Sequence, residues 1–255
     1  MLFFLHIQKT AGSTFQFILE NSFGVNACHT NHAKKNIFTR ADLAFAQKFF
    51  PNLKSLAGHN LWDPLAFGVP DAFHLTFLRE PVARVFSYYQ DHLLSGKKIS
   101  FADFLRGDIC LDNLHVRLMA GEPNLDKAKK YLEQCGFVGL TEKFDLSLHV
   151  LQKLSPLPLN LNYKRRRSAP SNEVKKKLEN DPRMVELAIA HNQLDLQLYE
   201  FAVKEIFPRH CARAGFKPDD QVASFDTYTT DKHWRYRMCH LYNSLIYRQA
   251  AKFRR

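Results

Sequence analysis

Several features that would classify this chain at once are missing from it. Its five cysteines are scattered and odd in number, and no Cys-x-x-Cys pair occurs, so neither a zinc ribbon nor a disulfide framework is expected. No apolar run approaches the ~18–20 residues that a membrane-spanning helix needs. Low-complexity tracts and internal repeats are absent as well. These absences favour a globular protein of a reducing compartment, and we expect it to be cytoplasmic and bacterial.

Acidic side chains are also in short supply. The sequence has 36 Lys and Arg residues against 25 Asp and Glu residues, which gives a net charge of +11. Such a balance implies anionic partners, among which are nucleotide phosphates, an acidic glycan, nucleic acid and a membrane surface. The 255 residues, 45% of them hydrophobic, are enough to bury one sizeable core.

The most informative segment lies at the start of the chain. The apolar run at 2–7 predicts a short buried strand, and the turn at 8–14 leads into a helix expected over 13–22. Backbone N–H groups at the start of a helix lack partners, and the helix dipole favours a negative charge there. Because Lys9 adds a full positive charge, the turn is predicted to bind phosphate. It departs from a Walker A motif, since Lys9 precedes Gly12 instead of following the last glycine.

A second segment at 78–89 repeats this arrangement. Residues 73–78 alternate as a strand that ends at Arg79, and Pro81 suits the first position of a helix running to about residue 95. Arg84, Ser87 and Tyr88 share one face of that helix. A guanidinium and a hydroxyl that converge from a strand end and a helix predict a second anion pocket.

The remaining pattern alternates strands with helices. Further strands are expected over 53–58 and 137–140. Helices are expected over 41–49, 100–107, 111–120, 124–135, 171–179, 183–190, 193–206 and 231–252, and another from Thr141. A loop is expected at 24–39 and a linker at 208–230. This order predicts an α/β fold with a P-loop-like parallel sheet flanked by helices in three layers, α/β/α, and extra C-terminal helices. Ligands then bind beyond the carboxyl ends of the strands, where Lys9 and Arg79 both lie.

The two phosphate segments together resemble the sulfotransferases that use 3′-phosphoadenosine 5′-phosphosulfate (PAPS). The chain is most similar to the glycan group that contains the heparan sulfate 2-O- and 6-O-sulfotransferases. The resemblance covers roughly residues 2–207 and continues at Val138-Gly139-Leu140-Thr141-Glu142, at the basic run 164–167 and at 195–202. It implies a catalytic domain over 1–207, followed by a linker and a basic helix over 208–255.

The resemblance also implies roles for particular residues. The first turn would hold the 5′-phosphosulfate, which assigns Lys9, Thr10, Ala11, Gly12, Ser13 and Thr14. Arg79 and Ser87 would bind the 3′-phosphate. A basic loop would close over the nucleotide, which points to Arg165, Arg166, Arg167 and Ser168 without fixing which of them touches it. The catalytic base would be His59 of the Gly58-His59 pair, with Lys9 acting beside it.

Sulfonyl transfer makes chemical sense of these roles. The acceptor hydroxyl must lose a proton as it attacks sulfur, and histidine titrates in the range in which it can accept one. Lys9 and the N–H groups of the turn can stabilise the charge that grows on the departing phosphate. The migrating group carries a single negative charge, so no metal is expected, and the sequence has no Asp-rich metal motif.

The acceptor is less defined by the sequence. A basic chain suits an anionic or neutral glycan, and Trp62, Arg84 and His92 are candidate acceptor-binding residues. Trp62 and Trp234 either stack on sugar rings or pack in the core. The alternatives are a P-loop kinase or NTPase and a basic nucleic-acid-binding module, although no nucleic-acid partner is expected. For localisation, the alternative is a Golgi-lumen catalytic domain trimmed of its anchor.

Overall fold

A single parallel sheet organises the molecule. The computed structural model describes residues 1–33, 37–69, 71–107, 110–164, 173–228 and 234–252. The sheet has the order β2 (Ala27–His29), β3 (Ser55–Gly58), β1 (Leu2–Leu5), β4 (Phe73–Leu78) and β5 (Phe137–Leu140). Every neighbouring pair of strands is parallel, so all five carboxyl ends lie along one edge.

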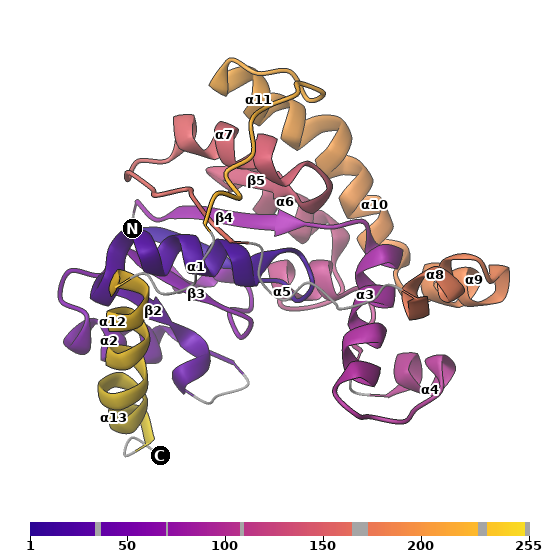
Figure 1. Ribbon diagram of the computed structural model, residues 1–255, viewed down its shortest axis with the longest axis horizontal. Coiled ribbons are helices and arrows are strands. Elements are labelled where there is room, and N and C mark those ends of the chain that lie inside the picture. Colours follow the sequence, from indigo (N-terminus) through magenta and orange to yellow (C-terminus); the bar gives the residue numbers. More distant parts are fainter. Residues whose placement is uncertain (34–36, 70, 108–109, 165–172, 229–233, 253–255) are drawn as a thin grey trace.

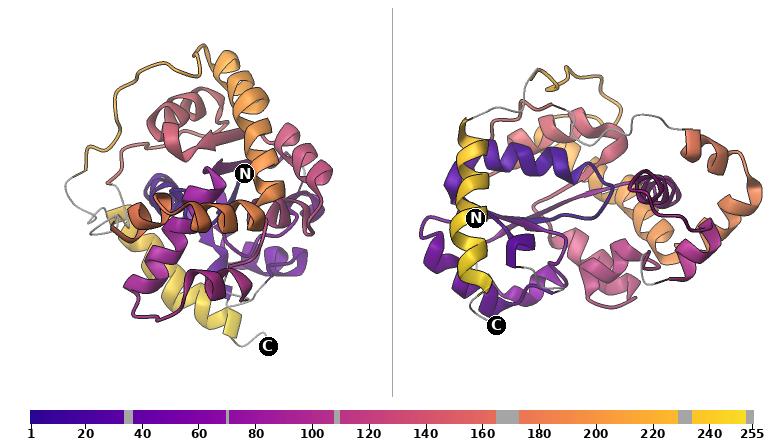
Figure 2. Two further views of the ribbon diagram at one scale, coloured as in Figure 1. Left: turned by 90° about the vertical axis from the view of Figure 1, so that its right-hand side faces the viewer. Right: turned by 60° about the horizontal axis from the view of Figure 1, so that its bottom comes forward.

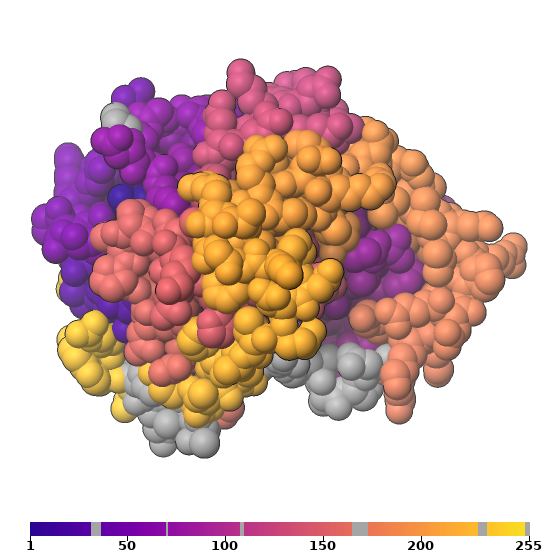
Figure 3. Space-filling view, turned by 90° about the horizontal axis from the view of Figure 1, so that it is seen from above, coloured from indigo at the N-terminus to yellow at the C-terminus, as the bar shows by residue number. Residues whose placement is uncertain are grey.

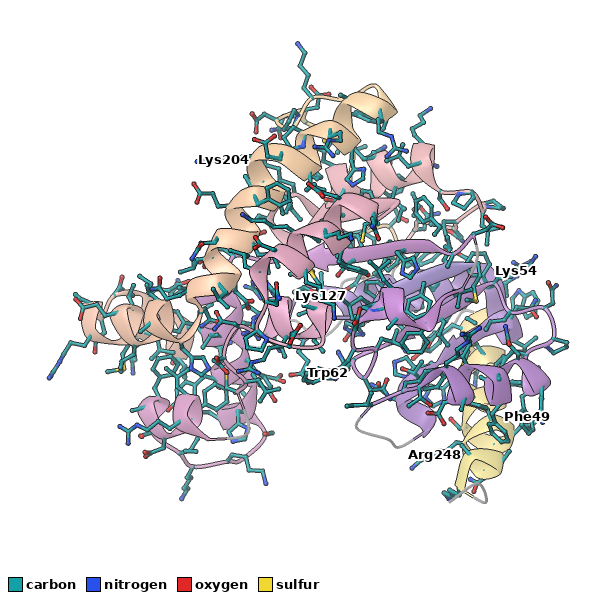
Figure 4. The ribbon with its side chains drawn as sticks, turned by 180° about the vertical axis from the view of Figure 1, so that it is seen from behind. Phe49, Lys54, Trp62, Lys127, Lys204 and Arg248 are labelled. Atoms are coloured by element: carbon teal, nitrogen blue, oxygen red, sulfur yellow. The ribbon has the colours of Figure 1, made fainter. Side chains whose placement is uncertain are left out.

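Helices cover both faces of this sheet and make three layers. On one face lie α1 (Gly12–Phe23) and α7 (Phe144–Leu154), and on the other lie α2 (Arg40–Phe49), α5 (Leu114–Ala120) and α6 (Leu125–Gln134) (Figures 1 and 4). Successive strand residues point to opposite faces. Phe4 therefore packs against Phe15 of α1, whereas Phe3 packs against Phe67 on the far side. The predicted three-layer α/β/α fold is confirmed.

A second group of helices extends beyond the carboxyl edge of the sheet. It consists of α3 (Pro81–Leu94), α4 (Phe101–Arg106), α8 (Glu173–Glu179) and α9 (Pro182–His191), which enclose a separate apolar cluster (Figure 2). From α9 the chain returns along α10 (Gln193–Phe201). Within the described ranges, no helix has the length and apolarity needed to cross a membrane.

The region expected to be a loop at 24–39 contains the edge strand β2. Only Ala27, Cys28 and His29 form it, between short 3₁₀ turns at Gly24–Asn26 and Thr30–Ala33. A run of three residues is too short to show strand periodicity in the sequence. The pairing with β3, and the burial of Ala27 and Cys28, decide its conformation instead.

The linker expected to begin at residue 208 begins later. A π-helical turn at Ala202–Ile206 leads into α11 (Phe207–Ala214), which carries Pro208 in its first turn. The wider π turn accommodates the proline, which has no N–H to donate and would clash with a regular preceding turn. Beyond α11, the chain lies across α7 (Figure 3). Asp145 accepts a hydrogen bond from the N–H of Phe225, and His149 contacts the carbonyl of Ala223.

The predicted C-terminal helix is present over its described part. It consists of α12 (Trp234–Tyr242), a π-helical turn at Asn243–Tyr247 and α13 (Arg248–Lys252). Asn243 fastens this helix to the outer edge of β2. Its side-chain oxygen accepts from the N–H of His29, and its side-chain nitrogen donates to the carbonyl of Ala27. The side-chain amide of Asn243 thereby hydrogen-bonds one N–H and one C=O group of β2 that no neighbouring strand pairs in the described sheet.

Candidate functional site

The turn after β1 has a backbone that few non-glycine residues adopt. Lys9 and Ala11 have φ angles of 67° and 61°, both in the left-handed region. Ala11 is also the N-cap of α1, and its side chain makes no capping hydrogen bond. The N–H group of Thr14 donates to the carbonyl of Ala11, whereas the N–H groups of Gly12 and Ser13 receive no cap from the Ala11 side chain. Such a concave turn at a helix N-terminus suits an anion.

Gly12 allows the turn to pack closely against β1. A Cβ atom added at Gly12 would collide with the imidazole ring of His6, which is nearly fully buried. The Thr10 hydroxyl donates to the carbonyl of Ile7 at 3.0 Å and so stiffens the turn from within. Of the predicted 5′-phosphosulfate residues, Thr10 thus uses its hydroxyl internally, whereas Ser13 is partly exposed at the helix start.

The two predicted phosphate segments meet through Arg79. Its Nη1 atom donates to the carbonyl of Lys9 at 3.1 Å, which ties the end of β4 to the turn after β1. The Lys9 ammonium lies 3.4 Å from a carboxylate oxygen of Asp91 on α3. Ser87 is half-buried on the same helix, and its hydroxyl bonds to none of the residues that the structure describes.

The Glu142 carboxylate hydrogen-bonds to the segment after β4 and to α10 at this edge of the sheet. Glu142 follows β5, and its carboxylate accepts from the N–H of Glu80 at 3.0 Å and from the Tyr199 hydroxyl at 2.9 Å. Burial, followed by the charge of Glu142, raises the pKa of Tyr199. Burial lowers the pKa of Arg79, an effect that the Glu142 carboxylate opposes. Sequence reasoning assigned no role to Glu142, although its place just after a strand was a usable signal.

His59 follows β3 at the same edge. The preceding Gly58 has no room for a Cβ atom, which would collide with the Thr30 hydroxyl. His59 Nδ1 lies 2.6 Å from the carbonyl oxygen of His6. A carbonyl only accepts, so Nδ1 carries the hydrogen and the lone pair of the neutral ring resides on Nε2. The rings of His59 and His6 lie 3.8 Å apart between centroids, which connects His59 to the glycine turn.

The family model described as "Sulfotransferase family" matches residues 1–202. The chain belongs to this family. Among solved structures, a sulfotransferase from Alicyclobacillus acidocaldarius is 14% identical, with a TM-score of 0.39, and the match covers 76% of this chain and 95% of that one. The comparison with curated proteins finds no match. Sulfonyl transfer is thus the general activity, and a P-loop kinase or NTPase and a nucleic-acid module are not favoured.

Not all candidate acceptor residues of this sulfotransferase lie where an acceptor could reach them. Arg84 is fully buried, with its Nη2 atom 3.4 Å from the side-chain oxygen of Asn192, so it is not exposed to an acceptor in this structure, and its predicted contact stays a prediction. His92 is half-buried and packs against Phe104. Trp62 is half-buried against the core and precedes Asp63, whose carboxylate pairs with Lys127; Trp62 and Lys127 are both labelled in Figure 4.

Arg84 instead belongs to a buried polar cluster behind α3. Asp195, also fully buried, accepts from the N–H groups of His115 and Val116 at 2.9 Å each, and so caps the start of α5. Burial raises the pKa of Asp195 to about 6, while the positive charge of Arg84 opposes the rise. The cluster connects α3, which carries Ser87 and Asp91, to α5 and α10.

Two predictions concern other parts of the chain. Arg165, Arg166, Arg167 and Ser168 lie outside the described residues. Across the described ranges, no three His, Cys, Asp or Glu side chains gather where they could hold a metal ion.

Proposed function

We propose that the protein transfers the sulfonyl group of PAPS to a hydroxyl of a carbohydrate acceptor and releases 3′-phosphoadenosine 5′-phosphate. The observation that carries this proposal is the hydrogen bond from Arg79 to the carbonyl of Lys9. This bond joins the end of β4, which carries Arg79, to the turn after β1, which carries Lys9. Both lie beside the N-terminus of α1, whose N-cap residue Ala11 makes no side-chain hydrogen bond. A nucleotide with phosphates at both its 3′ and 5′ positions needs two such anion sites close together.

The residues at this edge fit the donor. The left-handed turn at Lys9 and Ala11 would direct backbone N–H groups toward a 5′-phosphosulfate. Gly12 has no Cβ to collide with the His6 ring, so the turn can keep this shape. Arg79 and the hydroxyl of Ser87 would hold the 3′-phosphate. The donor supplies the activated sulfonyl group and keeps the bridging oxygen when the sulfur–oxygen bond breaks.

His59 is proposed to act as the general base. The carbonyl of His6 fixes the ring with its hydrogen on Nδ1, so Nε2 can take the proton of the acceptor hydroxyl as that oxygen bonds to sulfur. Lys9 and the N–H groups at the start of α1 would stabilise the negative charge left on the 5′-phosphate. The proton ends on His59 and the electron pair on the departing phosphate oxygen.

A glycan acceptor is the finer part of the proposal. It rests on the net charge of +11 and on the sequence resemblance to the heparan sulfate 2-O and 6-O group. An anionic saccharide is favoured over a neutral one by that charge. We assign transfer to residues 1–207 and treat 208–255 as an addition to this catalytic unit.

The test combines donor binding with turnover. Labelled PAPS is incubated with a panel of oligosaccharides and the wild-type protein, His59→Ala, and His149→Ala as a matched control, since His149 lies away from the strand ends on α7. We expect His59→Ala to bind 3′-phosphoadenosine 5′-phosphate like wild type but to lose turnover by about 10²–10⁴-fold. His149→Ala should retain turnover.

Three results would count against different parts of the proposal. Full turnover by His59→Ala would remove His59 from the mechanism but leave the donor site intact. Equal donor affinity of wild type, Lys9→Ala and Arg79→Ala would contradict the assigned nucleotide site. Transfer to a non-carbohydrate hydroxyl, with no glycan accepted, would overturn the acceptor class alone.

A further inference from the structure

The C-terminal helix presents an uncovered row of large apolar side chains. Trp234, Met238, Leu241 and Leu245 are 69%, 49%, 52% and 65% exposed. Their spacing of four, three and four residues places them along one face. Ile246 is 47% exposed as well, but it directly follows Leu245 and so points in a different direction. We call Trp234, Met238, Leu241 and Leu245 the apolar row. Large apolar side chains gathered on one surface, unlike single exposed ones, mark an interaction site.

The opposite face of this helix is already occupied. Cys239, Asn243 and Tyr247 are almost fully buried, and Asn243 is bonded to both Ala27 and His29 of the sheet edge. The helix is therefore held against β2 at the edge of the sheet, and it runs along the outside of the molecule (Figure 2). Because the buried face is satisfied, the apolar row faces outward in the folded chain.

The basic residues of the C-terminal helix indicate which kind of partner could cover the apolar row. Residues 234–252 contain Arg235, Arg237, Arg248 and Lys252 and not one Asp or Glu. A second copy of the same helix would bring like charges together, which is unfavourable. A polyanionic glycan would satisfy the cations but leave the apolar row in water. An anionic lipid surface satisfies both, because apolar side chains enter the acyl boundary while long basic side chains reach the headgroups.

We propose that the C-terminal helix 234–252 is a peripheral anchor for an anionic lipid surface. Trp234 suits the interfacial region, where its ring is apolar and its N–H can meet water or headgroups. Arg235 lies beside it, with its guanidinium 5.4 Å from the indole ring, but its Nη1 atom donates to the carbonyl of Ser22. The cations proposed to reach the headgroups are therefore Arg237, Arg248 and Lys252. Arg248, at the other end of the helix, is labelled in Figure 4. This role is separate from sulfonyl transfer and does not depend on it.

The test measures binding of the full-length protein to vesicles. Vesicles of phosphatidylglycerol mixed with phosphatidylcholine are compared with vesicles of phosphatidylcholine alone by co-sedimentation. The test variant is Leu241→Glu with Leu245→Glu. The control is Leu187→Glu with Ile189→Glu, which adds the same charges at exposed apolar positions of α9. We expect the test variant to bind anionic vesicles roughly tenfold more weakly or worse, and the control to bind like wild type.

Fluorescence gives a second readout of the same contact. In a Trp62→Phe background only Trp234 emits, and we expect its emission to shift to the blue on anionic vesicles. The variant Leu241→Ser with Leu245→Ser repeats the test without added charge. No binding of wild type to anionic vesicles, or equal loss in the control pair, would overturn the proposal. Self-association that the test variant abolishes, or heparin binding without vesicle binding, would assign the row to a second copy or to a glycan instead.

Discussion

The Lys9 side chain forms an ion pair with a carboxylate of the neighbouring helix α3. Its ammonium lies 3.4 Å from Asp91, a residue of the helix that also carries Ser87. The Asp91 side chain is 53% exposed, so this ion pair contributes little to stability. We propose that its effect is local, because a carboxylate beside the proposed anion site would compete with an incoming phosphate for the Lys9 ammonium.

Removing the Asp91 charge should therefore improve donor binding. We predict that Asp91→Asn binds 3′-phosphoadenosine 5′-phosphate up to about fivefold more tightly, as expected for an exposed pair worth at most ~1 kcal/mol. Isothermal titration calorimetry measures the change, with Asp103→Asn as control, since Asp103 pairs with Arg106 on α4. Weaker binding by Asp91→Asn would mean that Asp91 orients Lys9 and does not compete for it.

At the scale of elements, the glycine turn depends on the contact between α1 and β1. The His6 ring occupies the space that a Cβ at Gly12 would need. We predict that Gly12→Ala shifts the start of α1 and weakens donor binding by an order of magnitude or more. In Gly12→Ala with His6→Ala, part of that affinity should return, because the obstructing ring is gone.

The control for this pair is His6→Ala alone. His6→Ala measures the loss of the ring itself and so allows the coupling to be isolated in a double-mutant cycle. Additive losses in the double variant would contradict the packing explanation. Tight donor binding by Gly12→Ala alone would show that the turn tolerates the added methyl group.

Elements with strong local patterns were predictable from the sequence. The apolar alternation at 73–78 matches β4, and the prediction of 41–49 agrees with α2 to within one residue. Lys9, Gly12 and Arg79 could be proposed as site residues from the sequence because each lies at a strand-to-helix junction. In contrast, β2 is defined by pairing and burial, and α11 by a π turn before a proline. The three residues of β2 are too few to leave a periodic signal. In α11 the buried Phe207, His210 and Cys211 do have helical spacing, but Pro208 among them favours a linker.

Contacts between distant segments at the candidate site could not be predicted from the sequence either. Glu142, Asp91 and the carbonyl of His6 act through contacts between elements far apart in the chain. Their roles depend on how β1, β3, β4 and β5 align at one edge, which no single segment reveals. Arg84 shows the reverse case, because it was predicted to face an anion or an acceptor and is fully buried beside Asn192.

At the scale of the whole molecule, buried titratable groups couple stability to pH. Burial lowers the pKa of His74 and of His210 to about 4. In the unfolded chain these groups bind protons near pH 6.5. The unfolded state thus binds more protons than the folded one between about pH 4 and 6.5, so the two histidines make stability fall as pH falls. Asp195, with a pKa of about 6, opposes this trend as a single group.

We predict a net loss of stability on acidification from pH 6.5 toward pH 4. Urea unfolding at several pH values measures the slope. In His74→Phe, which keeps an aromatic ring beside Phe3, the slope should decrease by up to about one proton. In Asp195→Asn the decline should become steeper, since the opposing group is removed. A flat profile, or an unchanged slope in His74→Phe, would contradict the buried-histidine explanation.

We propose that one doubly phosphorylated nucleotide spans the ends of β1 and β4, where Lys9 and Arg79 lie. A crystal structure of the complex with 3′-phosphoadenosine 5′-phosphate tests it most directly. We predict that the 5′-phosphate lies within about 3 Å of the N–H groups of Gly12 and Ser13, with the 3′-phosphate on Arg79 and Ser87. Density for the nucleotide at any other surface, with this turn left unoccupied, would contradict the account.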